Sequence, residues 1–103
     1  MFGKKRKTEG ELPTPPNATD DGTVEVLRVW AGPDEPQQLT LRPIWQDPGA
    51  WGLMLADIAR HAAAAYADKG ADPDQVLARI RELFEAEWEN PTDPLETYKD
   101  SDA

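Results

Sequence analysis

The segment from Asp47 to Gly70, DPGAWGLMLADIARHAAAAYADKG, limits how this chain can fold more than any other part of the sequence. Asp47 is a favourable helix N-cap, and Pro48 suits the first helical position, where its missing N–H would have no partner. Apolar residues then recur every three or four positions, and Gly70 can adopt the left-handed conformation that ends a helix. The spacing therefore predicts one long helix.

The predicted helix has apolar or small side chains on two sides when its residues are placed at helical spacing. The broad apolar arc comprises Trp51, Met54, Leu55, Ile58, Ala62, Ala65 and Tyr66, and a stripe of small residues comprises Gly52, Ala56, Ala59 and Ala63. Leu53 stands apart among polar positions. We therefore expect the helix to pack on a sheet with one side and on a second helix with the other.

A second helical pattern follows directly. Asp72 is a favourable N-cap, Pro73 suits the first position, and Asn90 with Pro91 ends the pattern. Its apolar side consists of Val76, Leu77, Ile80, Leu83, Phe84 and Trp88. We expect this whole side to lie in the core of the domain.

Two shorter segments, 23–30 and 38–42, are rich in β-branched, aromatic and alternating residues, which favour strands. The sequence between them, AGPDEP, contains turn residues that also prevent strand pairing. An antiparallel hairpin is the simplest connection. Val24 and Val26 alternate out of step with the rest of the first strand, so we expect a bulge or a change of face near Glu25.

The alternation assigns the side chains of this hairpin to two faces. The face expected to be buried consists of Leu27, Val29, Leu39 and Leu41, and the opposite face carries Arg28, Trp30, Thr40 and Arg42. An outward tryptophan beside arginines is either a cation–π contact on the surface or an anchor for a partner protein. The second possibility makes this face the candidate partner-binding site.

The expected architecture is one small α+β domain, residues 23–90, with a two-stranded antiparallel β-hairpin followed by two antiparallel helices (ββαα). Residues 1–22 and the acidic segment 91–103 have few apolar residues, so we expect disordered tails. A domain of this size has a marginal core. A homodimer is therefore an alternative, formed by joined sheet edges or by the small-residue stripe, which would also bury Leu53.

The charge distribution argues against nucleic acid and membrane surfaces as partners. The 103 residues carry a net charge of −9, although four basic residues lie in Lys4–Lys7, so the rest of the chain is strongly acidic and repels phosphate groups. The Lys4–Lys7 cluster is either a solvated tail or a weak electrostatic arm. The absence of cysteine fits a reducing compartment, and no apolar run has the length of a secretion signal or a membrane span. We expect a cytoplasmic protein.

Three titratable residues are candidates for a pocket. Asp57 precedes His61, the only histidine, by one helical turn, so the carboxylate could orient the imidazole, although a plain surface histidine has the same pattern. Glu87 lies within the apolar side of the second helix. It is either a general acid or base, or a last-turn residue whose side chain reaches water or pairs with Arg28 or Arg42. No cofactor or metal motif occurs, so we expect no cofactor or metal and assign no catalytic residue.

Three segments together resemble a family of short alphaproteobacterial proteins known only as a domain of unknown function. They are LRVW (27–30), DPGAWGLMLADIARHAAAAYA (47–67) and EAEWENPTD (85–93). The resemblance spans roughly residues 23–93 and implies a bacterial cytoplasmic protein with one small α+β domain. It implies no catalytic residues.

Three functional hypotheses follow from the sequence. The first, which we favour, is a non-catalytic protein-interaction or regulatory module that binds its partner through the hairpin face with Arg28 and Trp30. The second is a small enzyme or ligand-binding domain that uses Asp57, His61 and Glu87. The third, which rests on charge alone, is an acidic nucleic-acid mimic or an antitoxin-like partner.

Overall fold

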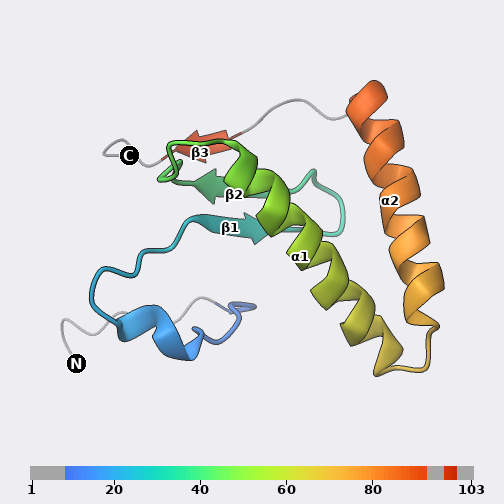
Figure 1. Ribbon diagram of the computed structural model, residues 1–103, viewed down its shortest axis with the longest axis horizontal. Coiled ribbons are helices and arrows are strands. Elements are labelled where there is room, and N and C mark those ends of the chain that lie inside the picture. The colour runs from blue at the N-terminus through green and yellow to red at the C-terminus, as the bar shows by residue number, and fades with distance from the viewer. Residues whose placement is uncertain (1–8, 93–96, 100–103) are drawn as a thin grey trace.

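The computed structural model describes residues 9–92 and 97–99 of the chain. Strands β1 (Leu27–Trp30) and β2 (Gln38–Leu41) are followed by helices α1 (Gly49–Ala67) and α2 (Pro73–Glu89). Figure 1 shows α1 lying over one face of the sheet and α2 returning beside α1, set off from the strands. This arrangement confirms the predicted α+β class with ββαα order.

The hairpin has the register that the alternation predicts. Leu27 lies opposite Leu41, and Val29 lies opposite Leu39, with the two strands antiparallel. Strand β1 begins only at Leu27, so the valines that alternate out of step lie before it and the strand itself needs no change of face. One further hydrogen bond, from the Arg42 N–H to the Val26 carbonyl at 2.9 Å, extends the pairing past the strand ends.

Helix α1 begins and ends by the predicted devices. The Asp47 carboxylate accepts a hydrogen bond from the Gly49 N–H at 2.8 Å, which satisfies one of the free donors at the helix start. The Trp45 ring packs edge-on against the Trp51 ring, with centroids 5.3 Å apart, and holds the preceding chain against the first turn. Gly70 has φ of +100°, the left-handed conformation that lets the chain turn toward α2.

Helix α2 starts at a side-chain cap and follows α1 in the opposite direction (Figure 1). The Asp72 carboxylate accepts a hydrogen bond from the Asp74 N–H at 2.9 Å, with Pro73 at the first helical position. Two intrahelical ion pairs lie along it, Arg79 with Glu82 at 2.8 Å and Arg81 with Glu85 at 2.9 Å. The sequence cues for this helix are therefore confirmed at its start.

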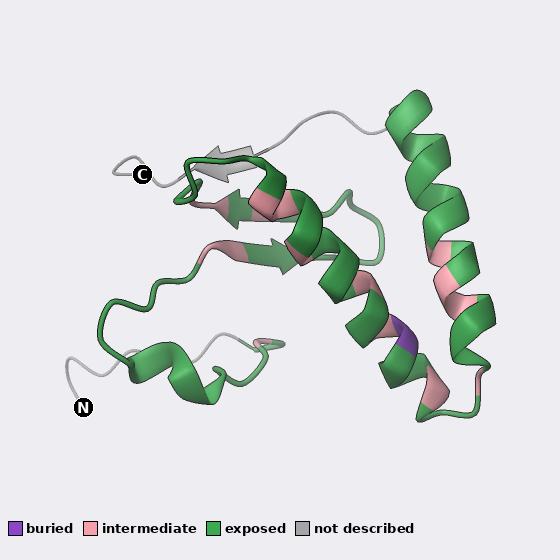
Figure 2. Ribbon diagram, in the orientation of Figure 1, coloured by how far each residue is buried: buried purple, intermediate pink, exposed green. Residues whose placement is uncertain are grey.

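Little of the described chain is buried. Ala63 of α1, at 3% exposure, is the one core residue among the described positions, and half-buried positions on α2 are confined to the half nearest its connection with α1 (Figure 2). The expectation that the whole apolar side of α2 lies in the core is wrong, because its first half is only half-buried and Leu83, Phe84 and Trp88 are exposed. The physical reason is that α2 diverges from α1 beyond their connecting turn, and no described strand lies alongside it (Figure 1).

Two segments expected to be disordered tails contain secondary structure. Strand β3 (Thr97–Lys99) pairs in parallel with β2, so that the sheet has three strands in the order β1-β2-β3. Near the other end, residues 16–19 form a short 3-10 helix, η1 (Pro16–Thr19). The Lys4–Lys7 cluster lies outside the described residues. Neither α1 nor α2 combines the length and apolar character that a membrane span requires.

Candidate functional site

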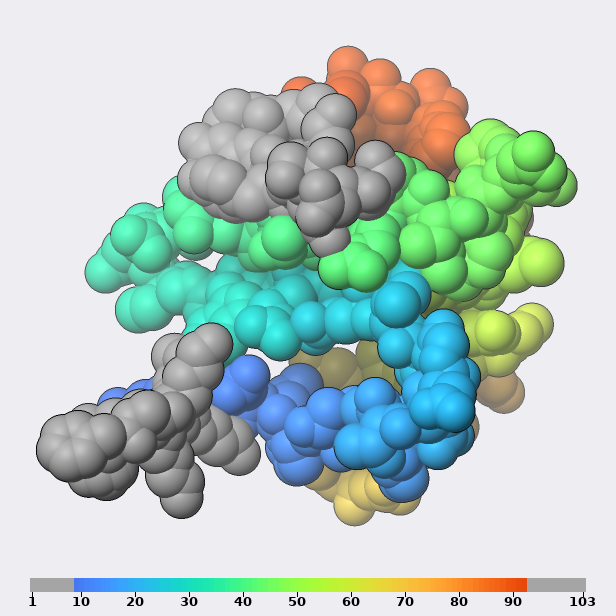
Figure 3. All heavy atoms as spheres, turned by 90° about the vertical axis from the view of Figure 1, so that its left-hand side faces the viewer, coloured from blue at the N-terminus to red at the C-terminus, as the bar shows by residue number. Residues whose placement is uncertain are grey.

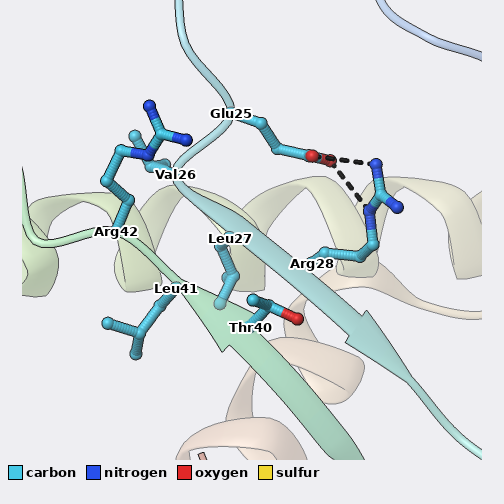
Figure 4. Close-up of a pocket in the computed structure, with 7 residues that line it drawn as sticks. All are labelled: Glu25, Val26, Leu27, Arg28, Thr40, Leu41 and Arg42. Carbon is cyan, nitrogen blue, oxygen red and sulfur yellow. Dashed lines mark hydrogen bonds and ion pairs between the residues drawn. The ribbon is translucent and has the colours of Figure 1, made fainter. Parts of the chain in front are cut away.

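The hairpin register determines which side chains lie on the sheet face opposite α1. Arg28 lies opposite Thr40, and Trp30 lies opposite Gln38, each one position out of step with the half-buried leucines of the two strands. Figure 4 shows the helices behind the two strands, with Arg28 and Thr40 next to one another in front. We call the face with Arg28, Trp30, Thr40 and Arg42 the outer sheet face.

Arg28 is held in place on this face by Glu25. Its Nη2 donates to Glu25 Oε1 at 2.8 Å and its Nε donates to Glu25 Oε2 at 3.2 Å, a two-point contact between guanidinium and carboxylate. This hydrogen bonding, with the charge of Glu25, raises the pKa of Arg28 above its already high ordinary value. Both side chains remain exposed, so the pair orients the arginine at the surface without burying it.

Three of the four predicted residues line one shallow hollow. Arg28, Thr40 and Arg42 surround a space of about 290 Å³ across the two strands (Figure 4). Glu25, Val26, Leu27 and Leu41 complete its lining. Thr40 is exposed, whereas Arg42 is half-buried. The structure therefore combines arginine, hydroxyl and apolar groups in a site that is open to a partner.

Trp30 lies in a second hollow, of about 410 Å³, which the sequence did not predict. The opposite wall of this hollow is the segment Gly10–Pro15, and Figure 3 shows the N-terminal segment, in blue, beneath the hairpin. Gly10 has φ of +86°, and a Cβ placed on it would lie 3.8 Å from Cζ3 of Trp30. Trp30 nevertheless keeps 38% of its surface exposed. The one available signal for this wall is the proline-rich sequence ELPTPP, which favours an extended chain.

The three residues of the alternative pocket each lie on a helix surface. Asp57 is 3.8 Å from Arg60 on the same helix, and His61 is exposed. Glu87 accepts hydrogen bonds from the Thr92 N–H at 2.7 Å and from the Thr92 hydroxyl at 2.9 Å. Neither hollow described above is lined by any of the three. The structure therefore places none of the three at either hollow.

The described residues form no candidate metal site. Within residues 9–92 and 97–99, no group of three or more histidine, cysteine, aspartate or glutamate side chains is arranged so that it could hold a metal ion.

This chain is similar to one family model and to solved structures. A family model described as a domain of unknown function (DUF5076) matches residues 11–92. A similar solved structure is named "Structure of a putative pyruvate dehydrogenase from the photosynthetic bacterium Rhodopseudomonas palustrus CGA009". It is 38% identical, covers 97% of this chain and 99% of its own, and has a TM-score of 0.69. No curated protein matches this chain.

Proposed function

This chain belongs to the DUF5076 family, a domain of unknown function, and we propose that it is a small non-catalytic protein-interaction module. In this proposal it binds a partner protein through the outer sheet face. The observation that carries the proposal is the hairpin register, because it gathers Arg28, Thr40 and Trp30 on the face that the helices leave open.

The residue types on this face support protein binding. Tryptophan and arginine are over-represented among the residues that contribute most to the affinity of protein interfaces. Glu25 restrains Arg28 before a partner arrives, so less side-chain freedom is lost on binding. A shallow hollow with mixed polar and apolar walls suits the side chains of a protein surface.

The N-terminal segment belongs to the proposed interaction module. The family match begins at residue 11, so it includes most of the segment that forms the wall opposite Trp30. A partner that contacts the indole ring of Trp30 therefore also reaches this segment. The absence of cysteine supports a place in the reducing bacterial cytoplasm, which is part of the proposal.

The activity in the name of the similar structure is not extended to this chain. That structure shares the fold and 38% of the aligned residues with it. In the described part of this chain, the titratable side chains that sequence reasoning selected lie on helix surfaces and line neither hollow.

Affinity capture from the native cell tests the proposal. The wild type is compared with Trp30→Ala and Arg28→Ala, which each remove one side chain of the outer sheet face. Arg60→Ala is the matched control for Arg28→Ala, because both arginines are exposed and lie near a carboxylate three residues earlier. We expect the partner to be recovered with the wild type and the control and to be lost with the other two. Equal recovery with all four would refute the proposal.

A further inference from the structure

The apolar stripe of α2 is covered along only half its length. Val76, Leu77 and Ile80 lie half-buried beside α1, whereas the last three members of the same stripe, Leu83, Phe84 and Trp88, are exposed. The Phe84 and Trp88 rings are stacked, with centroids 5.6 Å apart and an interplanar angle of 24°. The end of α2 therefore presents one continuous apolar surface, of the kind that an amphipathic helix normally packs against another element.

Helix α1 has a matching uncovered surface on the side that approaches α2. Leu55, Ala59 and Ala63 form one row at four-residue spacing, and along this row the residues change from exposed to half-buried to buried. Ile58, beside Leu55, is also exposed. The exposure increases along α1 because the two helices are closest at their connecting turn and diverge toward the other end (Figure 1). The exposed ends of both apolar rows lie where the helices separate.

The uncovered surface has the size that a stable dimer needs. The five side chains Leu55, Ile58, Leu83, Phe84 and Trp88 are between 42% and 74% exposed. With about 150–200 Å² for a fully exposed side chain of this size, they present roughly 400–500 Å² of apolar area per copy. A standard interface buries about 800 Å² per partner, of which roughly 60–65% is apolar. The exposed apolar area of each copy therefore matches the apolar part of a standard interface.

We propose that a second copy of this chain covers this surface. In the dimer, Phe84 and Trp88 of each α2 pack against Leu55 and Ile58 on the α1 of the other copy. Because each copy provides both halves of the contact, the surface is self-complementary, as a two-fold dimer requires. Ala63 is the one buried residue among the described positions, so a single copy has little core and needs further apolar contacts. A second copy meets that need.

The charged side chains near the stripe make their contacts within the same copy. Arg79 and Arg81 are already paired with glutamates on α2, and the Glu87 carboxylate is occupied by Thr92. Association then depends on apolar contact, while each copy contributes a net charge of −9. Added salt screens that repulsion, so we expect salt to strengthen the dimer. The helices form this interface, and the outer sheet face remains available, so the inference is independent of the proposed function.

Sedimentation equilibrium of the full chain over a hundredfold range of concentration tests the dimer. We expect wild type to be dimeric and its Tm to rise with protein concentration, as for any folded state stabilised by association. Trp88→Ser should raise the dimer Kd at least about tenfold, since it removes the most exposed aromatic of the stripe. Leu53→Ser is the matched control, because Leu53 is 73% exposed and Trp88 is 74% exposed, but Leu53 lies on another side of α1.

Several results would overturn the inference. A wild type that sediments as a monomer throughout, with a Tm independent of concentration, excludes the dimer. If Leu53→Ser dissociates the dimer and Trp88→Ser does not, the interface lies at the small-residue stripe instead. If added salt weakens the dimer, the interface is not the apolar one proposed. If Trp88→Ser does not fold, NMR of a mixture of isotope-labelled and unlabelled wild type tests the interface directly. We expect intermolecular contacts between the Trp88 ring and Leu55 methyl groups, and their absence refutes the proposed interface.

Discussion

The guanidinium of Arg28 contacts both carboxylate oxygens of Glu25, at 2.8 and 3.2 Å, on the surface of the sheet. Because the two residues are exposed, the pair is screened by solvent and serves mainly to orient the arginine. Orientation is what a binding face requires of its arginine, so the Glu25–Arg28 pair links the fold of the hairpin to the proposed function.

Glu25→Ala should release Arg28 without unfolding the domain. We expect the Arg28 Nε–H to exchange faster with water in the variant, while the Tm stays unchanged, because an exposed pair contributes little to stability. Proton exchange measured by NMR provides the first readout and thermal unfolding the second. Glu82→Ala, which releases Arg79 on α2, is the control and should leave Arg28 exchange as in wild type. Unaltered Arg28 exchange in Glu25→Ala would contradict the orienting role.

Asp72→Ala should lower the free energy of unfolding by about 1 kcal/mol, which is the usual cost of losing a helix N-cap. The lost contact is the 2.9 Å hydrogen bond from the Asp74 N–H. Urea denaturation measures the effect. Asp68→Ala is a suitable control because Asp68 follows the last residue of α1, where a carboxylate caps no N–H group. A larger loss from Asp68→Ala than from Asp72→Ala would show that the assignment of the cap is wrong.

Ala63→Leu should destabilise the domain by about 1–3 kcal/mol, because Ala63 is buried and extra methyl groups would force the packing around it apart. Ala64→Leu adds the same groups at the next residue, which is exposed, and should change stability by less than about 0.5 kcal/mol. Denaturant unfolding of both variants gives the comparison. Equal effects would mean that Ala63 is not at a packed contact.

His61→Ala and Asp57→Ala should each leave the free energy of unfolding within about 0.5 kcal/mol of wild type, as is usual for surface substitutions. The exposed imidazole and the 3.8 Å distance from Asp57 to Arg60 are the reasons. The same denaturant measurements provide the test. A loss of several kcal/mol from either change would show a structural network that this account lacks.

The helix ends and the hairpin register could be predicted because each depends on local chemistry. Asp47, Asp72 and Gly70 act through their own side chains or backbone freedom, so their roles are visible without tertiary structure. Alternation predicted the face with the half-buried Leu39 and Leu41 and assigned Arg28 and Thr40 to the outer sheet face. Val29, expected on the same face as the leucines, is exposed.

The exposure of the end of α2, the third strand and the wall opposite Trp30 could not be predicted, because each depends on where the elements lie relative to one another. Trp88 has the spacing of a core residue, and only the divergence of α2 from α1 leaves it 74% exposed. Strand β3 lies in an acidic segment whose composition indicates disorder, and its backbone pairing with β2 is a long-range contact. The wall opposite Trp30, formed by Gly10–Pro15, is likewise a contact between distant parts of the chain.

Site-directed photo-crosslinking in a lysate of the native cell tests the central claim most directly, because this sequence contains no cysteine and a single introduced one can be labelled uniquely on the purified protein before mixing. Thr40→Cys places a photoreactive label in the hollow between Arg28 and Arg42, and Ala64→Cys places the same label on an exposed position of α1. We predict a specific adduct with one partner protein from the Thr40 position and none from the Ala64 position. Absence of any adduct at Thr40, or the same adducts at both positions, would contradict the assignment of the outer sheet face as the binding surface.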